Sequence, residues 1–188
     1  FLLIFFIFKY KFMKTKFRLF GLLLFTLVVL NCAKEDVSAL DENSSLNEQL
    51  ATLILQKTNK IRTDQGLTAL IQNDEMDALA KFHSDNMVKE GFFDHTDHEG
   101  NSPSDRADNA GYGWSRIAEN IVYVPWFENV SGCGDTRSAE ALSACMVEGW
   151  RNSPGHYANM IGDYVQLGVG VSFTQDSIAY ATQVFRTP

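Results

Sequence analysis

The sequence predicts an α+β domain in which helices pack against an antiparallel sheet. In the first half, apolar residues recur at helical spacing, as between Leu46 and Ile61 and between Met76 and Met87. In the last third, apolar and small or polar residues alternate over 165–173 and again over 178–184, with a turn-sized gap between them. This alternation predicts a β-hairpin with one face on a core. The chain has 188 residues, of which 45% are hydrophobic, enough for one such domain.

Turn and cap residues divide the rest of the chain. Gly66 and Gly91 are natural helix ends, and Ser102-Pro103 is a natural helix start. Gly168 and Gly170 leave one face of the hairpin nearly bare, so that a helix or another backbone can pack closely there. The expected elements are helices over about 46–66, 74–91, 102–111 and from 136 or 138 to 152, and a strand over 117–124.

The N-terminal segment predicts export. A basic stretch after Met13 precedes an apolar run over 19–30, which is the order of a signal peptide and is short for a membrane span. We interpret residues 1–12 as lying upstream of the start at Met13; the alternative is that the two apolar runs insert together as a helical pair. The run ends in Val-Leu-Asn followed by Cys32, which resembles a bacterial lipoprotein cleavage box, with Asn less usual than Gly, Ala or Ser before the cysteine. We therefore expect residues 1–31 to be extension and signal peptide, lipid on Cys32, a polar tether over 32–45, and a domain over 46–188. The alternative is an ordinary secretory peptide with an incidental cysteine.

The other two cysteines predict a disulfide. If Cys32 carries lipid, Cys133 and Cys145 remain, and an even remainder in an oxidising compartment indicates one bond between them. Two buried free thiols are the alternative.

The charge distribution argues against nucleic-acid binding. Residues 1–31 hold five basic residues and no acid, so the remainder has 11 basic and 23 acidic residues, a net charge of −12. Such a body repels phosphate backbones. The chain also has no Gly-rich phosphate loop, no Gly-x-Ser-x-Gly elbow and no His-Glu-x-x-His helix.

Five short motifs follow one another over about residues 48–185. They are Leu79-Ala80 with Gly91-Phe92-Phe93-Asp94-His95-Thr96, Ser102-Pro103 with Arg106 and Gly111-Tyr112, Ala118-Glu119-Asn120-Ile121, Trp150 to His156 with Ala158 to Ile161, and Leu167 to Val171. In this order they resemble the CAP (SCP-like) superfamily of cysteine-rich secretory, antigen 5 and pathogenesis-related proteins. The resemblance implies a three-layer α-β-α sandwich with a central antiparallel sheet. It also implies a cleft where His95, Glu119 and His156 converge. In the eukaryotic branch a second Glu follows the Trp by three residues; Ser153 stands there, as in the bacterial branch.

Such a cleft could hold Zn²⁺ or another divalent metal. Two imidazoles, His95 and His156, would give a weak, open site, with Glu119 as a ligand or as the general base for a bound water. The alternative is that Glu119 accepts hydrogen bonds from both histidines and only ties loops together. We expect Asn120 and Ser153 to support the cleft.

Other residues are weaker candidates. His95 and His98 form a rival local metal pair in a polar loop, whereas His83 is expected to be a satisfied core histidine. Trp150 is expected to anchor the core. Trp114 and Trp126 are candidates for a binding surface, and Arg106 for an ion pair on a helix surface.

These observations support three functions. The first is a monomeric envelope lipoprotein, periplasmic or on the cell surface, whose domain binds a small molecule, lipid or protein. The second is a metal-assisted hydrolase of an envelope peptide, ester or glycan. The third is a structural or adhesive surface domain.

Overall fold

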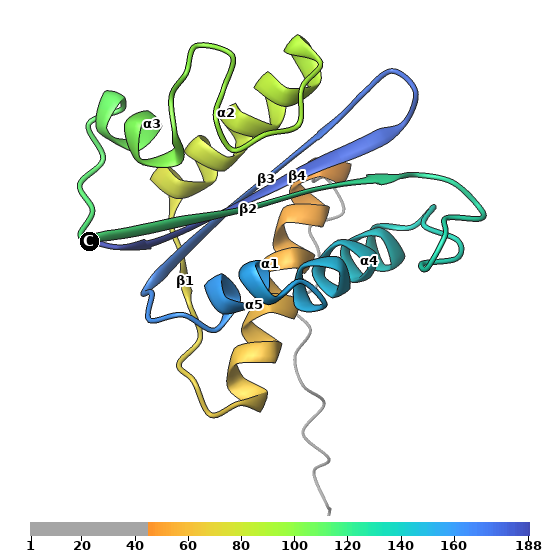
Figure 1. Ribbon diagram of the computed structural model, residues 1–188. Coiled ribbons are helices and arrows are strands. Elements are labelled where there is room, and N and C mark those ends of the chain that lie inside the picture. The colour runs from red at the N-terminus through yellow and green to blue at the C-terminus, as the bar shows by residue number, and fades with distance from the viewer. Residues whose placement is uncertain (1–44) are drawn as a thin grey trace, which may run out of the picture. The chain divides into compact units, whose positions relative to one another are not determined.

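The computed structural model describes residues 45–188. The predicted signal peptide, Cys32 and the predicted tether up to residue 44 lie outside the described residues. Helices and strands alternate along the described part of the chain (Figure 1). In chain order they are α1 (Leu46–Asp64), β1 (Ile71–Gln72), α2 (Asp74–Glu90), α3 (Pro103–Asn109), β2 (Arg116–Pro125), α4 (Ala139–Arg151), α5 (Pro154–Met160), β3 (Gln166–Phe173) and β4 (Ile178–Thr187).

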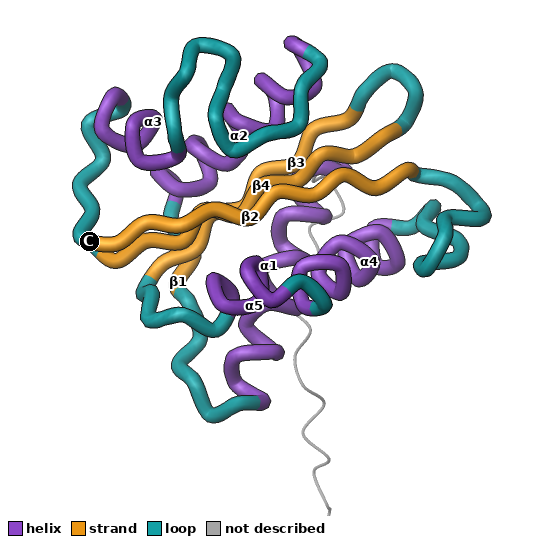
Figure 2. The backbone as a smooth tube through the Cα atoms, viewed as in Figure 1, coloured by secondary structure: helices purple, strands orange, loops and turns teal. Residues whose placement is uncertain are grey.

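The described elements form three layers, as expected. Helices α2 and α3 lie on one face of the sheet, and α1, α4 and α5 lie on the other (Figure 2). The strand order is β1-β3-β4-β2, and β4 pairs antiparallel with both β2 and β3.

The sheet is not wholly antiparallel, which corrects one detail of the expectation. The two-residue strand β1 pairs parallel with β3, because the link from α1 to α2 runs along the sheet edge, where Ile71 N–H donates to Val165 O. Two residues carry too little alternation to be recognised as a strand in the sequence.

Polar side chains cap most of the described helices at their N-termini. The side chains of Asn73, Ser102 and Ser138 cap α2, α3 and α4, and Ser102 forms a capping box with Asp105 behind Pro103. Gly91 ends α2 in the left-handed conformation. The segment Ser153-Pro154-Gly155 follows the expected helix end at 152. It lies just beyond the end of α4 and starts the further helix α5, with Pro in the first turn.

The two faces of the sheet bury separate apolar clusters. The larger cluster includes Trp150, Phe185 and Leu167 and lies under α1 and α4. On the other face, α2 lies directly on Gly168 and Gly170, as the bare face predicted. A Cβ at Gly168 would lie 2.0 Å from the carbonyl carbon of Met76, and one at Gly170 would lie 2.1 Å from the backbone nitrogen of Lys81.

Cys133 and Cys145 form the predicted disulfide, with their Cα atoms 5.5 Å apart. The bond joins the loop before α4 to the helix itself. Because it closes a short loop, we expect Cys133→Ser with Cys145→Ser to lower the free energy of unfolding by about 2–3 kcal/mol. Chemical denaturation of both proteins measures the difference, and equal midpoints would contradict the prediction. Wild-type protein treated with reductant should reproduce the loss seen in the double variant.

Candidate functional site

Glu119 is a carboxylate buried at the centre of the molecule. It lies in the middle of β2, and its side chain points to the face of the sheet that carries α2 and α3, where it is 1% exposed. A buried carboxylate is costly unless positive or donor groups surround it.

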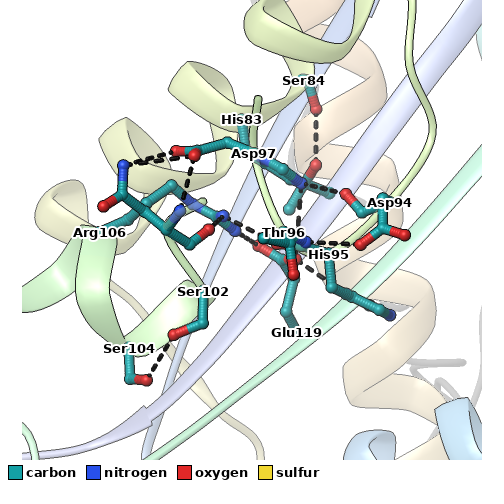
Figure 3. Close-up of polar contacts among 12 residues, drawn as sticks. His83, Ser84, Asp94, His95, Thr96, Asp97, Ser102, Ser104, Arg106 and Glu119 are labelled. Carbon is teal, nitrogen blue, oxygen red and sulfur yellow. Dashed lines mark hydrogen bonds and ion pairs between the residues drawn. The ribbon is translucent and has the colours of Figure 1, made fainter. Parts of the chain in front are cut away.

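Arg106 and His95 supply those groups. Arg106 Nη2 donates to Glu119 Oε2 at 2.5 Å, and His95 Nδ1 donates to Glu119 Oε1 at 2.9 Å (Figure 3). Arg106 Nη1 also donates to the carbonyls of His95 and Asn101, at 2.8 and 3.0 Å. The sequence suggested that Arg106 forms an ion pair on a helix surface, and this expectation is wrong because the ion pair is buried. The Arg106 side chain is 4% exposed, and it holds the His95 loop against β2.

His83 on α2 is a core histidine, as expected, but it is not fully satisfied. Its Nε2 donates to Asp94 O at 2.9 Å and lies 3.7 Å from Glu119 Oε1. With the proton on Nε2, Nδ1 keeps a lone pair, and this atom is buried without a hydrogen-bond partner among the described residues. Burial lowers the pKa of His83, and this effect is larger than the opposing attraction of Glu119. The neutral form of the ring is therefore favoured.

His95 is the solvent-accessible member of the group. Its side chain is 46% exposed, and the hydrogen bond to Glu119 raises its pKa above the usual value. That bond uses Nδ1 and sets the ring orientation, so Nε2 is the nitrogen left for an outside group. A carboxylate behind a histidine in this way fixes the tautomer of metal-binding imidazoles in proteins.

His156 lies in the opposite layer, on α5. Burial and repulsion from His95 lower the pKa of this half-buried imidazole. Asn120 holds the backbone at this point: its Nδ2 donates to His156 O and to Gln183 Oε1, both at 3.1 Å, and its Oδ1 accepts from Asn159. These contacts join β2 to α5 and β4, and the role of Asn120 in supporting a cleft stays a prediction. The Ser153 side chain makes no capping hydrogen bond at the start of α5.

Of the three predicted site residues, only the imidazoles of His95 and His156 are available as metal ligands. Both oxygens of Glu119 are already bonded, to His95 and to Arg106, which leaves it as an orienting group rather than a ligand. Within residues 45–188, no group of three or more His, Cys, Asp or Glu side chains is arranged to hold a metal ion. Water or a bound ligand would have to complete any coordination by His95 and His156.

The three tryptophans named as candidates all make contacts within the domain. Trp150 is a core anchor, with its Nε1 donating to Ile121 O. Trp126 packs against the core and Phe173, and Trp114 is 37% exposed with its Nε1 bonded to Asp108. Another aromatic cluster was not indicated by the sequence. Phe93, Tyr123 and Tyr180 contact one another, and the ring centroids of the stacked Tyr123 and Tyr180 lie 5.5 Å apart. Only the strand register, which places Tyr123 opposite Tyr180, could have revealed it.

Two solved structures share this fold. An extracellular protein with an SCP domain from Bacillus anthracis superposes with a TM-score of 0.59 at 24% identity, covering 76% of this chain and 41% of that one. An outer surface protein of Borrelia burgdorferi superposes with a TM-score of 0.62 at 19% identity, covering 77% of this chain and 96% of that one. At such identities the likeness concerns the fold alone. Among residues 45–188, no helix is sufficiently long and apolar to traverse a bilayer.

Sequence relatives come from Bacillus subtilis. The chain is 33% identical to the uncharacterized membrane protein YlbC over 129 residues, and 27% identical to the uncharacterized protein YkwD over 118 residues. These alignments cover 66% and 62% of this chain but only 33% and 40% of the relatives, so the chain spans well under half of their length. The model of the CAP, or cysteine-rich secretory protein, family matches residues 55–185, so the chain belongs to this family.

Proposed function

We propose that this protein is a monomeric envelope lipoprotein, anchored through Cys32, whose CAP domain binds a ligand at the imidazole pair of His95 and His156. The observation that carries the proposal is the hydrogen bond from His95 Nδ1 to buried Glu119. It fixes one ring with Nε2 available to an outside group. Repulsion from His95 is one cause of the lowered pKa of His156, which supports a pairing of the two rings.

A divalent metal such as Zn²⁺ fits this pair as a ligand-completed site. His95 and His156 would hold the ion, and Glu119 would orient His95 from behind. Bound there, the ion would act as a Lewis acid toward an oxygen or nitrogen of the ligand. The Arg106–Glu119 pair keeps the orienting carboxylate in place and compensates its charge.

Zinc binding to the chelator-treated chain tests the proposal. Isothermal titration calorimetry should give one weak site, and His95→Ala and His156→Ala should each lower the affinity at least tenfold. Protons and metal compete for imidazole nitrogen, so the affinity should rise with pH. The raised pKa of His95 should shift this rise to a higher pH than an ordinary histidine would give.

His98→Ala is the matched control, because His98 lies in the same loop and belongs to the rival pair with His95. It should leave zinc binding unchanged. Loss of binding in His98→Ala, or no binding by the wild-type chain at pH 8, would overturn the proposal. A loss of thermal stability in His156→Ala without any effect on binding would favour the structural or adhesive role.

The opposed pKa directions of His95 and His156 support hydrolysis as a second candidate. A raised pKa suits His95 as a proton donor, and a lowered pKa suits His156 as a base. Glu119 is not the base in this scheme, because both its oxygens are engaged. Turnover of an envelope peptide, ester or glycan that disappears in both folded histidine variants would establish it.

A further inference from the structure

Strand β2 is an edge of the sheet, and the N–H and C=O groups of successive residues point alternately toward β4 and away from it. It pairs with β4 alone, and Trp126 N–H, just beyond its end, donates to Ser177 O. By this register the even-numbered residues of β2 face β4, while the odd-numbered residues turn their N–H and C=O groups outward. Outward groups of an edge strand are a template for pairing with another chain.

Side chains of this chain donate to three of the four outward carbonyls between Glu119 and Pro125 of β2. Each is bonded by a donor from α4, α5 or the loop before α4, which protects the edge. The three bonds are Asn159 Nδ2 to Glu119 O at 3.3 Å, Trp150 Nε1 to Ile121 O at 3.0 Å, and Thr136 Oγ1 to Pro125 O at 2.6 Å.

Tyr123 is the exception between these positions. In the described part of the chain, no hydrogen bond from outside the sheet reaches its N–H or its C=O. Between Glu119 and Pro125, Tyr123 therefore presents a donor and an acceptor side by side, the pattern that one residue of an extended peptide matches with two hydrogen bonds.

The surroundings of Tyr123 fit an extended peptide on both sides of the sheet. On the α2 side lies the exposed aromatic cluster of Phe93, Tyr123 and Tyr180, in which Tyr123 is 50% exposed. On the α4 side, a groove of about 530 Å³ runs between β2 and α4, with Val122, Pro125, Val130 and Ala144 among its lining residues.

We propose that this edge binds an extended peptide segment, which forms a one-residue β-bridge with Tyr123. Because side chains alternate along a strand, the peptide residue opposite Tyr123 would lie on the aromatic cluster, and its two neighbours would enter the groove. The bonded carbonyls on either side confine the pairing to this position.

Charge specifies the peptide further. The only charged side chain among those lining the groove is Glu148, and residues 32–188 carry a net charge of −12. A basic peptide with an aromatic residue between two small apolar residues therefore matches the site. This proposal does not depend on the imidazole pair, so the zinc experiment and the one below can fail separately.

The probe is the capped peptide acetyl-Lys-Val-Tyr-Val-Lys-amide, titrated into the purified full chain and followed by NMR at the backbone amide of Tyr123. We expect a saturable shift with a dissociation constant of about 1 mM or tighter. N-methylation of the central Tyr removes the donor to Tyr123 O and should weaken binding at least tenfold. N-methylation of a flanking Val, whose N–H points away from β2, should change the affinity less than threefold.

Protein variants test the groove independently. Ala144 is exposed on α4 and lines the groove, so Ala144→Trp should fill it and abolish binding without touching the core. Ala78→Trp is the matched control, because Ala78 is exposed on α2, across the sheet, and should bind as the wild type does.

Three results would overturn the proposal. One is the absence of any shift at Tyr123 at millimolar probe. The second is equal weakening by both N-methyl peptides, which would show that no directional backbone bridge forms. The third is unchanged peptide binding in Ala144→Trp; if that variant instead blocks only an apolar probe such as a fatty acid, the groove is a lipid site.

Discussion

Arg106→Ala is expected to lower the free energy of unfolding by about 3–5 kcal/mol, because it leaves a buried carboxylate without its compensating charge. Glu119 is 1% exposed, and its Oε2 accepts from Arg106. The substitution also removes the donors to His95 O and Asn101 O. Urea denaturation of the two proteins measures the loss.

Arg116→Ala is the matched control for this prediction. Arg116 also forms an ion pair, with Asp163 at 2.9 Å, but the two side chains are 55% and 93% exposed. Such a surface pair contributes at most about 1 kcal/mol. If Arg106→Ala proves no more destabilising than Arg116→Ala, the buried pair does not organise the site as the structure indicates.

The loss of Arg106 should also loosen the loop that carries His95. Two of the guanidinium contacts hold that loop and the start of α3, while the third fixes the carboxylate that orients the imidazole. A mobile His95 should bind zinc less tightly even at temperatures where the variant stays folded. Stability and metal affinity are therefore expected to fall together in this one variant.

Gly170→Ala is expected to destabilise the domain by about 3 kcal/mol or more, through a clash between two backbones. The added Cβ would lie 2.1 Å from Lys81 N and 2.3 Å from Lys81 Cα. Backbone atoms cannot turn aside as a side chain does, so α2 would have to move away from β3. Thermal denaturation followed by circular dichroism measures the loss.

Gly149→Ala provides the opposite expectation for the same chemical change. Gly149 lies inside α4, and nothing stands within 4 Å of a Cβ built there. A glycine inside a helix costs about 0.5–1 kcal/mol relative to alanine, so this variant should be more stable than the wild type. Equal stabilities for the two variants would mean that α2 does not contact the sheet as closely as described.

The position of α2 matters to the site as well as to stability. The helix brings His83 to within 3.7 Å of Glu119, and the loop that follows it carries His95. A shift of α2 away from β3 would therefore separate the histidines from the carboxylate, so Gly170→Ala should also weaken zinc binding.

Local signals in the sequence predicted most of the elements. Caps such as Asn73 and Ser102 act within a few residues, and the alternation over 165–173 reflects which face of a strand is buried. The disulfide followed from the number of cysteines. The family motifs identified His95 and Glu119, which the structure joins by a hydrogen bond, and His156, whose part in a shared cleft stays a prediction.

What the sequence by itself determined is therefore the type and order of the main elements, the α+β class and the chemical groups available to the site. The tertiary structure decided which of these groups meet: Arg106 is buried against Glu119, and both carboxylate oxygens are occupied. It also decided that the backbone of Tyr123, between the bonded carbonyls of Ile121 and Pro125, stays open. The physical reason is range. Capping and periodicity act over a few residues, whereas these contacts depend on the register between β2 and β4 and on how closely α2 and α3 approach the sheet.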